Sequence, residues 1–143
     1  MKSRLEWLIY AILSAITAAL VAIFGKMGIQ GVDSVTATGI RAGIMFAVIA
    51  ILMLFTGRIH MITAVDSNSL FFITLGGIAG AASWIFYFFA LQTGKVSQVA
   101  PIDRLSVVFA VIFAALFLSE KINFPVALGV GLMAAGGIII CLA

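Results

Sequence analysis

Five apolar blocks, each close to the thickness of a lipid bilayer, dominate this sequence of 143 residues. The blocks cover about residues 7–24, 39–56, 70–91, 99–118 and 124–142. A helix needs ~20 mostly apolar residues to cross the hydrocarbon core, so each block predicts one membrane-spanning helix. The connectors between the blocks are too short for a second domain. We therefore expect an all-α membrane protein, a bundle of five transmembrane helices in one domain over residues 1–143.

The composition agrees with this class. The chain is 64% hydrophobic and 9% charged, whereas a soluble domain is about half apolar and about a quarter charged. The net charge of +3 does not indicate a nucleic-acid partner, because the basic residues stand singly beside apolar blocks, as flanking charges do. Lys2 and Arg4 precede the first block, but Glu6 and the lack of a small-residue cleavage site favour a retained helix over a cleaved signal peptide.

The second and fourth blocks each contain an arginine that the bilayer must accommodate. The uncharged runs after Arg41 and Arg104 are residues 42–56 and 105–119, 15 residues each. A helix of that length covers roughly 22 Å, against ~30 Å of hydrocarbon. Each helix must therefore begin one to two turns earlier, which puts both arginines and the neighbouring Asp103 inside the membrane edge.

A weak internal repeat supports this placement. When the chain is shifted by 63 residues, Arg41 falls on Arg104, and residues 46–49 fall on residues 109–112 with the same four letters, FAVI. A glycine, a serine and an alanine upstream of each arginine also match. Both arginines are therefore expected to enter the membrane from the same face at the same depth.

The flanking charges predict only a slight preference in orientation. The face that holds the N-terminus has Lys2, Arg4, Arg58 and Lys121, and the opposite face has Lys26 and Lys95. An excess of basic residues favours the cytoplasmic side, so the N-terminus is expected there. The excess is small enough to permit insertion in both directions.

Three stretches resemble the EamA domain of the drug/metabolite transporter superfamily. They are residues 84–97 (WIFYFFALQTGKVS), 99–106 (VAPIDRLS) and 117–122 (FLSEKI). The second stretch is similar to the short, single-domain bacterial branch of that family. The resemblance covers essentially the whole chain and implies half of a ten-helix transporter fold in a bacterial inner membrane. It further implies a small-molecule substrate and a second half, either an antiparallel homodimer partner or a sister protein in a heterodimer.

Three charged residues are candidates for substrate binding, because ionisable side chains inside a membrane segment mark functional sites. Asp103 either supports a helix start, where an acid favours the dipole, or pairs with an arginine and takes a proton or a cationic group. Arg104 either snorkels to the headgroups or pairs with Asp103. Arg41 either anchors to lipid phosphate or binds a substrate carboxylate through its planar fork. These charges indicate a zwitterionic or anionic metabolite.

Three further polar or aromatic residues are candidates for the same cavity. Trp84 and Tyr87 share one helix face by their spacing, and they either pack or form an aromatic wall. Gln98 is either a loop residue or a polar group of the cavity.

Three residues are given structural roles. Pro101 suits the first turn of a helix, and Glu120 stands where the family has a recurrent glutamate at a helix end. Gly131 lies between Ala127 and Ala135 at intervals of four residues. Such small faces let helices touch in lipid, either with the partner protomer or within the bundle.

Enzymatic chemistry finds little support in the sequence. His60 is the only histidine and Cys141 the only cysteine, so we expect no metal site, no cofactor and no enzyme. The alternative to a transporter is a membrane subunit that stabilises or regulates a partner transporter without moving solute itself.

Overall fold

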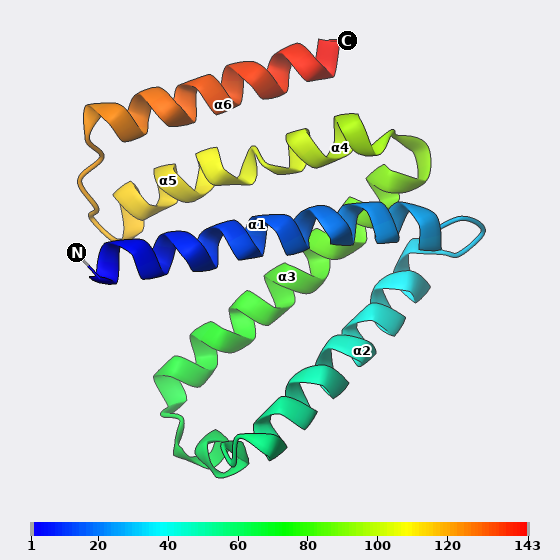
Figure 1. The fold of residues 1–143 in the computed structure, drawn as a ribbon, viewed down its shortest axis with the longest axis vertical. Helices are drawn as coiled ribbons and strands as arrows, with labels where there is room; N and C mark the ends of the chain where they lie inside the picture. Colours follow the sequence, from blue (N-terminus) through cyan, green and yellow to red (C-terminus); the bar gives the residue numbers. More distant parts are fainter. Residues whose placement is uncertain (1, 143) are drawn as a thin grey trace. The chain divides into compact units, whose positions relative to one another are not determined.

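The computed structural model describes residues 2–142, with side chains described from Glu6 onward, so the side chains of Lys2 and Arg4 lie outside the described part. Its elements are α1 (Lys2–Gly28), α2 (Ser34–Phe55), the 3-10 helix η1 (Ile59–Ala64), α3 (Ser67–Thr93), α4 (Val96–Asp103), α5 (Ser106–Phe117) and α6 (Phe124–Leu142) (Figure 1).

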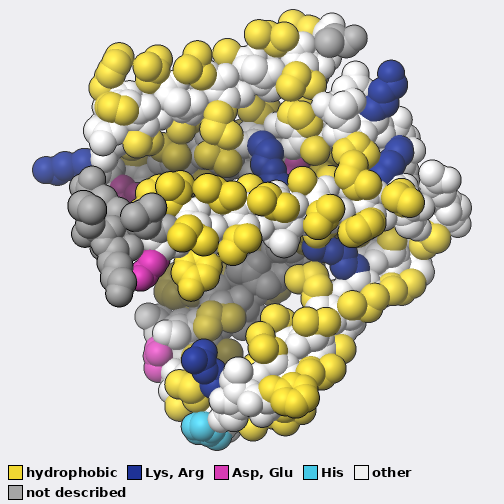
Figure 2. All heavy atoms as spheres, in the orientation of Figure 1, with side chains coloured by type: hydrophobic (Ala, Val, Ile, Leu, Met, Phe, Trp, Pro, Cys, Tyr) yellow, Lys and Arg dark blue, Asp and Glu magenta, His cyan; other side chains and the backbone are white. Residues whose placement is uncertain are grey.

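Five helical segments are long and apolar enough to cross a membrane, which confirms the predicted all-α, five-helix class. They are Glu6–Gly28, Ser34–Phe55, Ser67–Thr93, Val96–Phe117 and Phe124–Leu142. Large apolar side chains point outward along them, as far as 87% exposed at Phe55, and they cover much of the face seen in Figure 2. Such an apolar surface is suited to contact with the acyl chains of lipids, which are themselves apolar.

The chain divides into two compact units. One holds α1 up to Ala22 and the chain from Thr93 onward, and the other holds residues 23–92. We call them the α4–α6 unit and the α2–α3 unit. That all five helices form one domain stays a prediction.

Two helices begin earlier than hydropathy predicts, because polar caps lie outside the apolar blocks. The carboxylate of Asp33 accepts the backbone N–H of Thr36 at 3.0 Å, and α2 starts at Ser34 instead of near residue 39. In the same way Asp66 accepts the N–H of Ser69 at 3.0 Å, and α3 starts at Ser67 instead of near residue 70. These N–H donors hold the pKa of each carboxyl below its usual value.

The fourth predicted helix is divided in two. α4 ends at Asp103 and α5 begins at Ser106, with two residues between them. Pro101 in the last turn of α4 has no N–H, and its ring crowds the carbonyl four residues earlier. At the repeat-related position α2 has Thr38, whose hydroxyl donates to the carbonyl of Ser34 at 2.7 Å, and α2 continues unbroken. The two pieces still form one candidate span, Val96–Phe117, so the fourth predicted helix is present with a tightened turn at Arg104 and Leu105.

In the α4–α6 unit, α6 packs against both α4 and α5. The closest approach is at Gly137, which is buried: a Cβ built on it would lie 2.8 Å from Cδ2 of Leu105, in the break between α4 and α5. Val130, Ala134 and Gly137 lie on the less exposed side of α6, whereas Gly131 and Ala135 are exposed. The face with Gly131 is therefore not the face that α6 uses inside its own unit.

In the α2–α3 unit, a small core forms where the end of α1 meets the end of α3. Phe88 and Leu91 of α3 are buried, as is Ile29 in the turn after α1. The Lys26 ammonium donates to the carbonyl of Leu91, and the side-chain amide of Gln92 donates to the carbonyl of Val32 at 3.0 Å. The first bond ties the end of α1 to the end of α3, and the second ties the turn before α2 to the end of α3.

We expect Gly137→Ala to destabilise the protein relative to Gly136→Ala by about 1–3 kcal/mol, the usual cost of overpacking. A Cβ at Gly137 meets Leu105, while a Cβ at Gly136 has nothing within 4 Å. Thermal unfolding in detergent measures the difference. Equal melting temperatures for the two variants would show that Leu105 moves aside freely.

Candidate functional site

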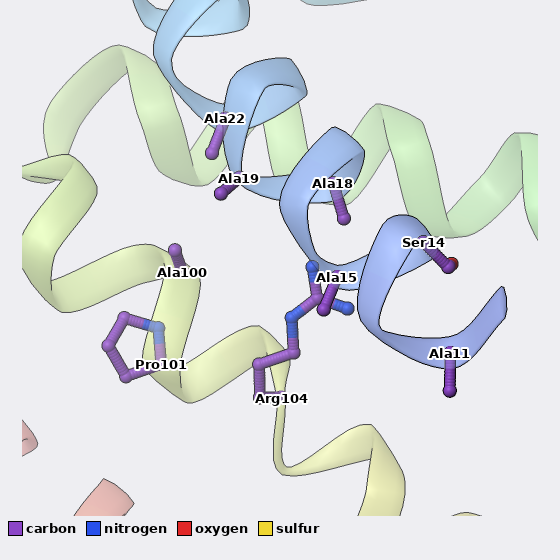
Figure 3. Close-up of a pocket in the computed structure, with 9 residues that line it drawn as sticks. All are labelled: Ala11, Ser14, Ala15, Ala18, Ala19, Ala22, Ala100, Pro101 and Arg104. Atoms are coloured by element: carbon purple, nitrogen blue, oxygen red, sulfur yellow. The ribbon is translucent and has the colours of Figure 1, made fainter. Parts of the chain in front are cut away.

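A cavity of about 470 Å³ lies in the α4–α6 unit, between α1 and α4. This volume is within the range of small-molecule sites, ~300–1,000 Å³. Its lining residues are Ala11, Ser14, Ala15, Ala18, Ala19, Ala22, Ala100, Pro101 and Arg104 (Figure 3). Eight of these nine residues are uncharged, so the lining combines methyl groups with one hydroxyl and one guanidinium.

The α1 wall of the cavity is a continuous stripe of small residues. Its members recur at intervals of three and four, at positions 11, 14, 15, 18, 19 and 22, which places them on one helix face. Every alanine of α1 belongs to this stripe. Sequence reasoning missed these residues, although the spacing was visible, because small residues in lipid usually mark direct helix contact. Here the stripe borders open space.

Arg104 is the only charged residue in the lining. It is the C-cap of α4, at the start of the break, and its guanidinium points toward α1 beside Ala15 (Figure 3). Arg104 comes eight residues after Val96, where the fourth span of 22 residues begins. It therefore lies about 12 Å into a span of about 33 Å. That Arg104 lies inside the membrane edge stays a prediction from the short uncharged run.

The other predicted residues of this unit lie around the cavity without lining it. Asp103 and Gln98 are half-buried on α4, and neither is among the lining residues. In the described part of the chain no ion pair joins Asp103 to Arg104. Pro101 does line the cavity. Glu120 is exposed in the loop after α5, where its backbone N–H donates to the carbonyl of Ala114 at 3.2 Å.

The α2–α3 unit brings three predicted residues together. The guanidinium carbon of Arg41 lies over the Trp84 ring, 3.1 Å from its centroid. Tyr87 meets Trp84 edge to face, with centroids 5.4 Å apart and planes at 79°. Phe88, which sequence reasoning missed, lies 5.8 Å from Trp84. Because 43 residues separate Arg41 from Trp84, no local pattern could have paired them.

The Trp84 ring stabilises the Arg41 guanidinium, since a desolvated cation–π contact is worth about 2 kcal/mol.

Both arginines have a side chain that can bind an anion. Each guanidinium offers a planar fork of N–H donors that matches a carboxylate or a phosphate. Among the described residues, no group of three or more histidine, cysteine, aspartate or glutamate side chains is arranged to hold a metal.

Comparison with known proteins agrees with this description. The model of the EamA-like transporter family matches residues 5–142. A protein from Sinorhizobium sp., described as "Uncharacterized transporter in cobO 3'region", is 41% identical over 135 residues, which cover 94% of this chain and 96% of that protein. No solved structure gives a significant match. With its spanning helices and its match along nearly the whole length, the chain belongs to the EamA-like family of membrane transporters.

Proposed function

We propose that this chain moves a small anionic solute across the bacterial inner membrane, as one half of an inverted dimer. The observation that carries the proposal is Arg104, a single cation in an otherwise uncharged cavity about one third of the way through a membrane span. A transporter needs a group that replaces the water a charged solute loses, and a guanidinium does this for an oxyanion.

The lining favours an anion over a zwitterion. A zwitterion brings an ammonium group that requires an acid or several acceptors, because an unpaired charge in a low dielectric is costly. The lining offers one hydroxyl, that of Ser14, and no carboxylate. Of the two substrate classes that the sequence indicates, the cavity therefore fits the anionic one better.

The break between α4 and α5 supports a substrate site at this depth. In membrane transporters, discontinuous helices carry solute and ion sites near the midplane, because the break frees backbone groups and turns side chains toward a cavity. Here the break places Arg104 and Pro101 on the cavity and leaves Asp103 half-buried beside it. Asp103 is proposed as the residue that takes a proton during transport.

An inverted homodimer would supply the second half that a five-helix chain lacks. Alternating access in related architectures uses two inverted halves that rock about a central site, and the near-balance of flanking charges permits both insertions. A Cβ built on Gly131 has nothing within 4 Å, and Ala127 and Ala135 on the same face are exposed. This small face is suited to close contact with a second helix, and we propose it for the partner protomer.

The transport assay uses purified protein in liposomes and three impermeant probes of equal chain length. These are hexanesulfonate, the zwitterionic aminohexanesulfonate and hexyltrimethylammonium. We expect saturable uptake of the anion above the other two, and at least a tenfold loss in Arg104→Gln, since a charge-assisted hydrogen bond of ~1.5–3 kcal/mol is removed. Ala18→Leu should block uptake by filling the cavity without changing charge.

The control for this assay is Arg58→Gln. It removes an exposed arginine next to η1, outside the cavity, and should leave uptake unchanged. If the purified protein moves none of the probes, the result contradicts transport by this chain alone and favours a membrane subunit that supports another transporter. Equal uptake in Arg104→Gln would remove Arg104 from the proposed site.

Asp103→Asn tests the proposed proton-accepting role. This variant keeps the size and polarity of the side chain and loses its titration, so we expect normal insertion and no net uptake of hexanesulfonate. Insertion is measured by membrane yield and melting temperature. Wild-type uptake by Asp103→Asn would end the proposal for this residue.

Labelling of Cys141 tests the inverted arrangement. It is the only cysteine of the chain, and it is exposed near the end of α6. With an impermeant maleimide we expect roughly equal labelling of intact cells and of inverted vesicles, whose outer surface is the cytoplasmic face. Labelling from one side only would contradict an inverted homodimer and would require a different partner, such as a sister protein, or a parallel dimer.

A further inference from the structure

We infer that Arg41, held on the face of Trp84, forms a second oxyanion-binding site in the α2–α3 unit, and that Phe88 and Gly25 position it. This inference deepens the proposed transport function and rests on it, since a solute must reach the site. It goes further by naming the ligand chemistry at Arg41 and two positioning residues that do not touch the ligand.

One face of the Arg41 guanidinium is covered by an aromatic ring. The guanidinium carbon of Arg41 lies 3.1 Å from the centroid of the Trp84 ring. The N–H donors of a guanidinium lie in its plane, at the edge. In the part of the chain that the structure describes, Arg41 has two recorded partners, the ring of Trp84 and a favourable electrostatic interaction with Tyr87, and no carboxylate pairs with it.

The position of Arg41 along its candidate span makes unpaired guanidinium N–H groups costly in free energy. Arg41 is half-buried and comes seven residues after Ser34, where the second span begins, which is about 10 Å along the helix. Water is scarce at that depth, and the Trp84 ring accepts charge but not five directional N–H bonds. An oxyanion supplies both a counter-charge and acceptors in the plane of the fork.

Trp84 is held in place from two sides. Tyr87 meets it edge to face at 5.4 Å, and Phe88 lies at 5.8 Å with the planes at 49°. Phe88 is only 4% exposed. A ring fixed by neighbouring rings keeps the Arg41 guanidinium in one orientation, which lowers the entropy lost when an anion binds.

Gly25 makes this arrangement possible. A Cβ built on Gly25 would lie 3.1 Å from Cε1 of Phe88 and 3.6 Å from Cδ1 of Leu91. Any side chain there would push the Phe88 ring, and through it Trp84, away from its present position. Gly28, one turn later on the same helix, has nothing within 4 Å of its Cβ position. It therefore provides a matched control for the effect of losing a glycine.

The chemistry specifies an oxyanion, and two sources provide one: the carboxylate of a small solute or the phosphate of a lipid headgroup. Both present paired oxygens to a guanidinium fork. We assign the site to the solute, because the proposed substrate is an anion and Arg104, at the repeat-related position, lines a cavity of small-molecule size.

Fluorescence of Trp84 reports the site directly. The chain has two tryptophans, and Trp7→Phe leaves Trp84 as the only one. Delipidated protein in maltoside detergent is titrated with sodium propionate at constant ionic strength, balanced by chloride. We expect a saturable change in emission that Arg41→Gln abolishes and that Arg41→Lys, which keeps charge but loses the planar fork, weakens at least tenfold. Arg58→Gln should respond as the parent does.

A second titration, with phosphatidylglycerol against diacylglycerol, separates the two sources. A response to propionate supports the solute site. A response to phosphatidylglycerol alone overturns it in favour of a lipid anchor, and no response to either overturns the oxyanion site altogether. Hexanesulfonate uptake separates this inference from the transport proposal: uptake without a Trp84 response sinks only the Arg41 site, whereas a response without uptake of any probe sinks transport.

The positioning role is tested with Gly25→Ala against Gly28→Ala. We expect Gly25→Ala to weaken propionate binding about threefold to tenfold and to shift the Trp84 emission maximum in the unliganded protein. Combining it with Phe88→Leu, which removes the ring that the new methyl group meets, should restore part of the affinity. Equal affinity and emission in both glycine variants would show that Gly25 and Phe88 only pack.

Discussion

An arginine below the lipid headgroups must find something to replace water, and this requirement shapes both units of the protein. In the α2–α3 unit the replacement is an indole face, with the guanidinium carbon of Arg41 3.1 Å from the Trp84 centroid. In the α4–α6 unit it is a cavity that Arg104 shares with alanines. Neither environment gives a guanidinium a full set of hydrogen-bond acceptors, which is why both arginines are proposed to bind an anion.

The two repeat-related helices solve the problem of an embedded arginine in different ways. α2 remains continuous, and Thr38 donates its hydroxyl to the Ser34 carbonyl one turn earlier. In the other copy Pro101 occupies the related position, and the helix divides into α4 and α5. Three residues later, Arg104 caps the first piece and lines the cavity. Pro101 removes one N–H and crowds the carbonyl of residue 97, whereas the tightened turn lies three residues later, at Arg104 and Leu105, where backbone bonds span three residues instead of four.

Hydropathy alone predicted the class and the number of spans, because apolar length is a local property, and the length argument also predicted that the second helix begins one to two turns before Arg41, as it does at Ser34. The exact starts at Ser34 and Ser67 depend on capping by Asp33 and Asp66, which hydropathy does not report. The division at Pro101 was predictable in principle, yet a proline in the first turn of a helix has the same local signature. The pairing of Arg41 with Trp84 could not be predicted, because contacts between distant helices depend on how the chain folds back.

The alanine stripe of α1 has a consequence for substrate range. Apart from the hydroxyl of Ser14, this wall of methyl groups has no hydrogen-bonding groups or aromatic planes with which to distinguish the shape of a solute. Hydrophobic surfaces distinguish one methylene from the next by only ~1–3 kcal/mol even when closely fitted. Under the proposed transport function, selection at this wall falls on the sign of the charge, so solutes of diverse skeleton would share one path.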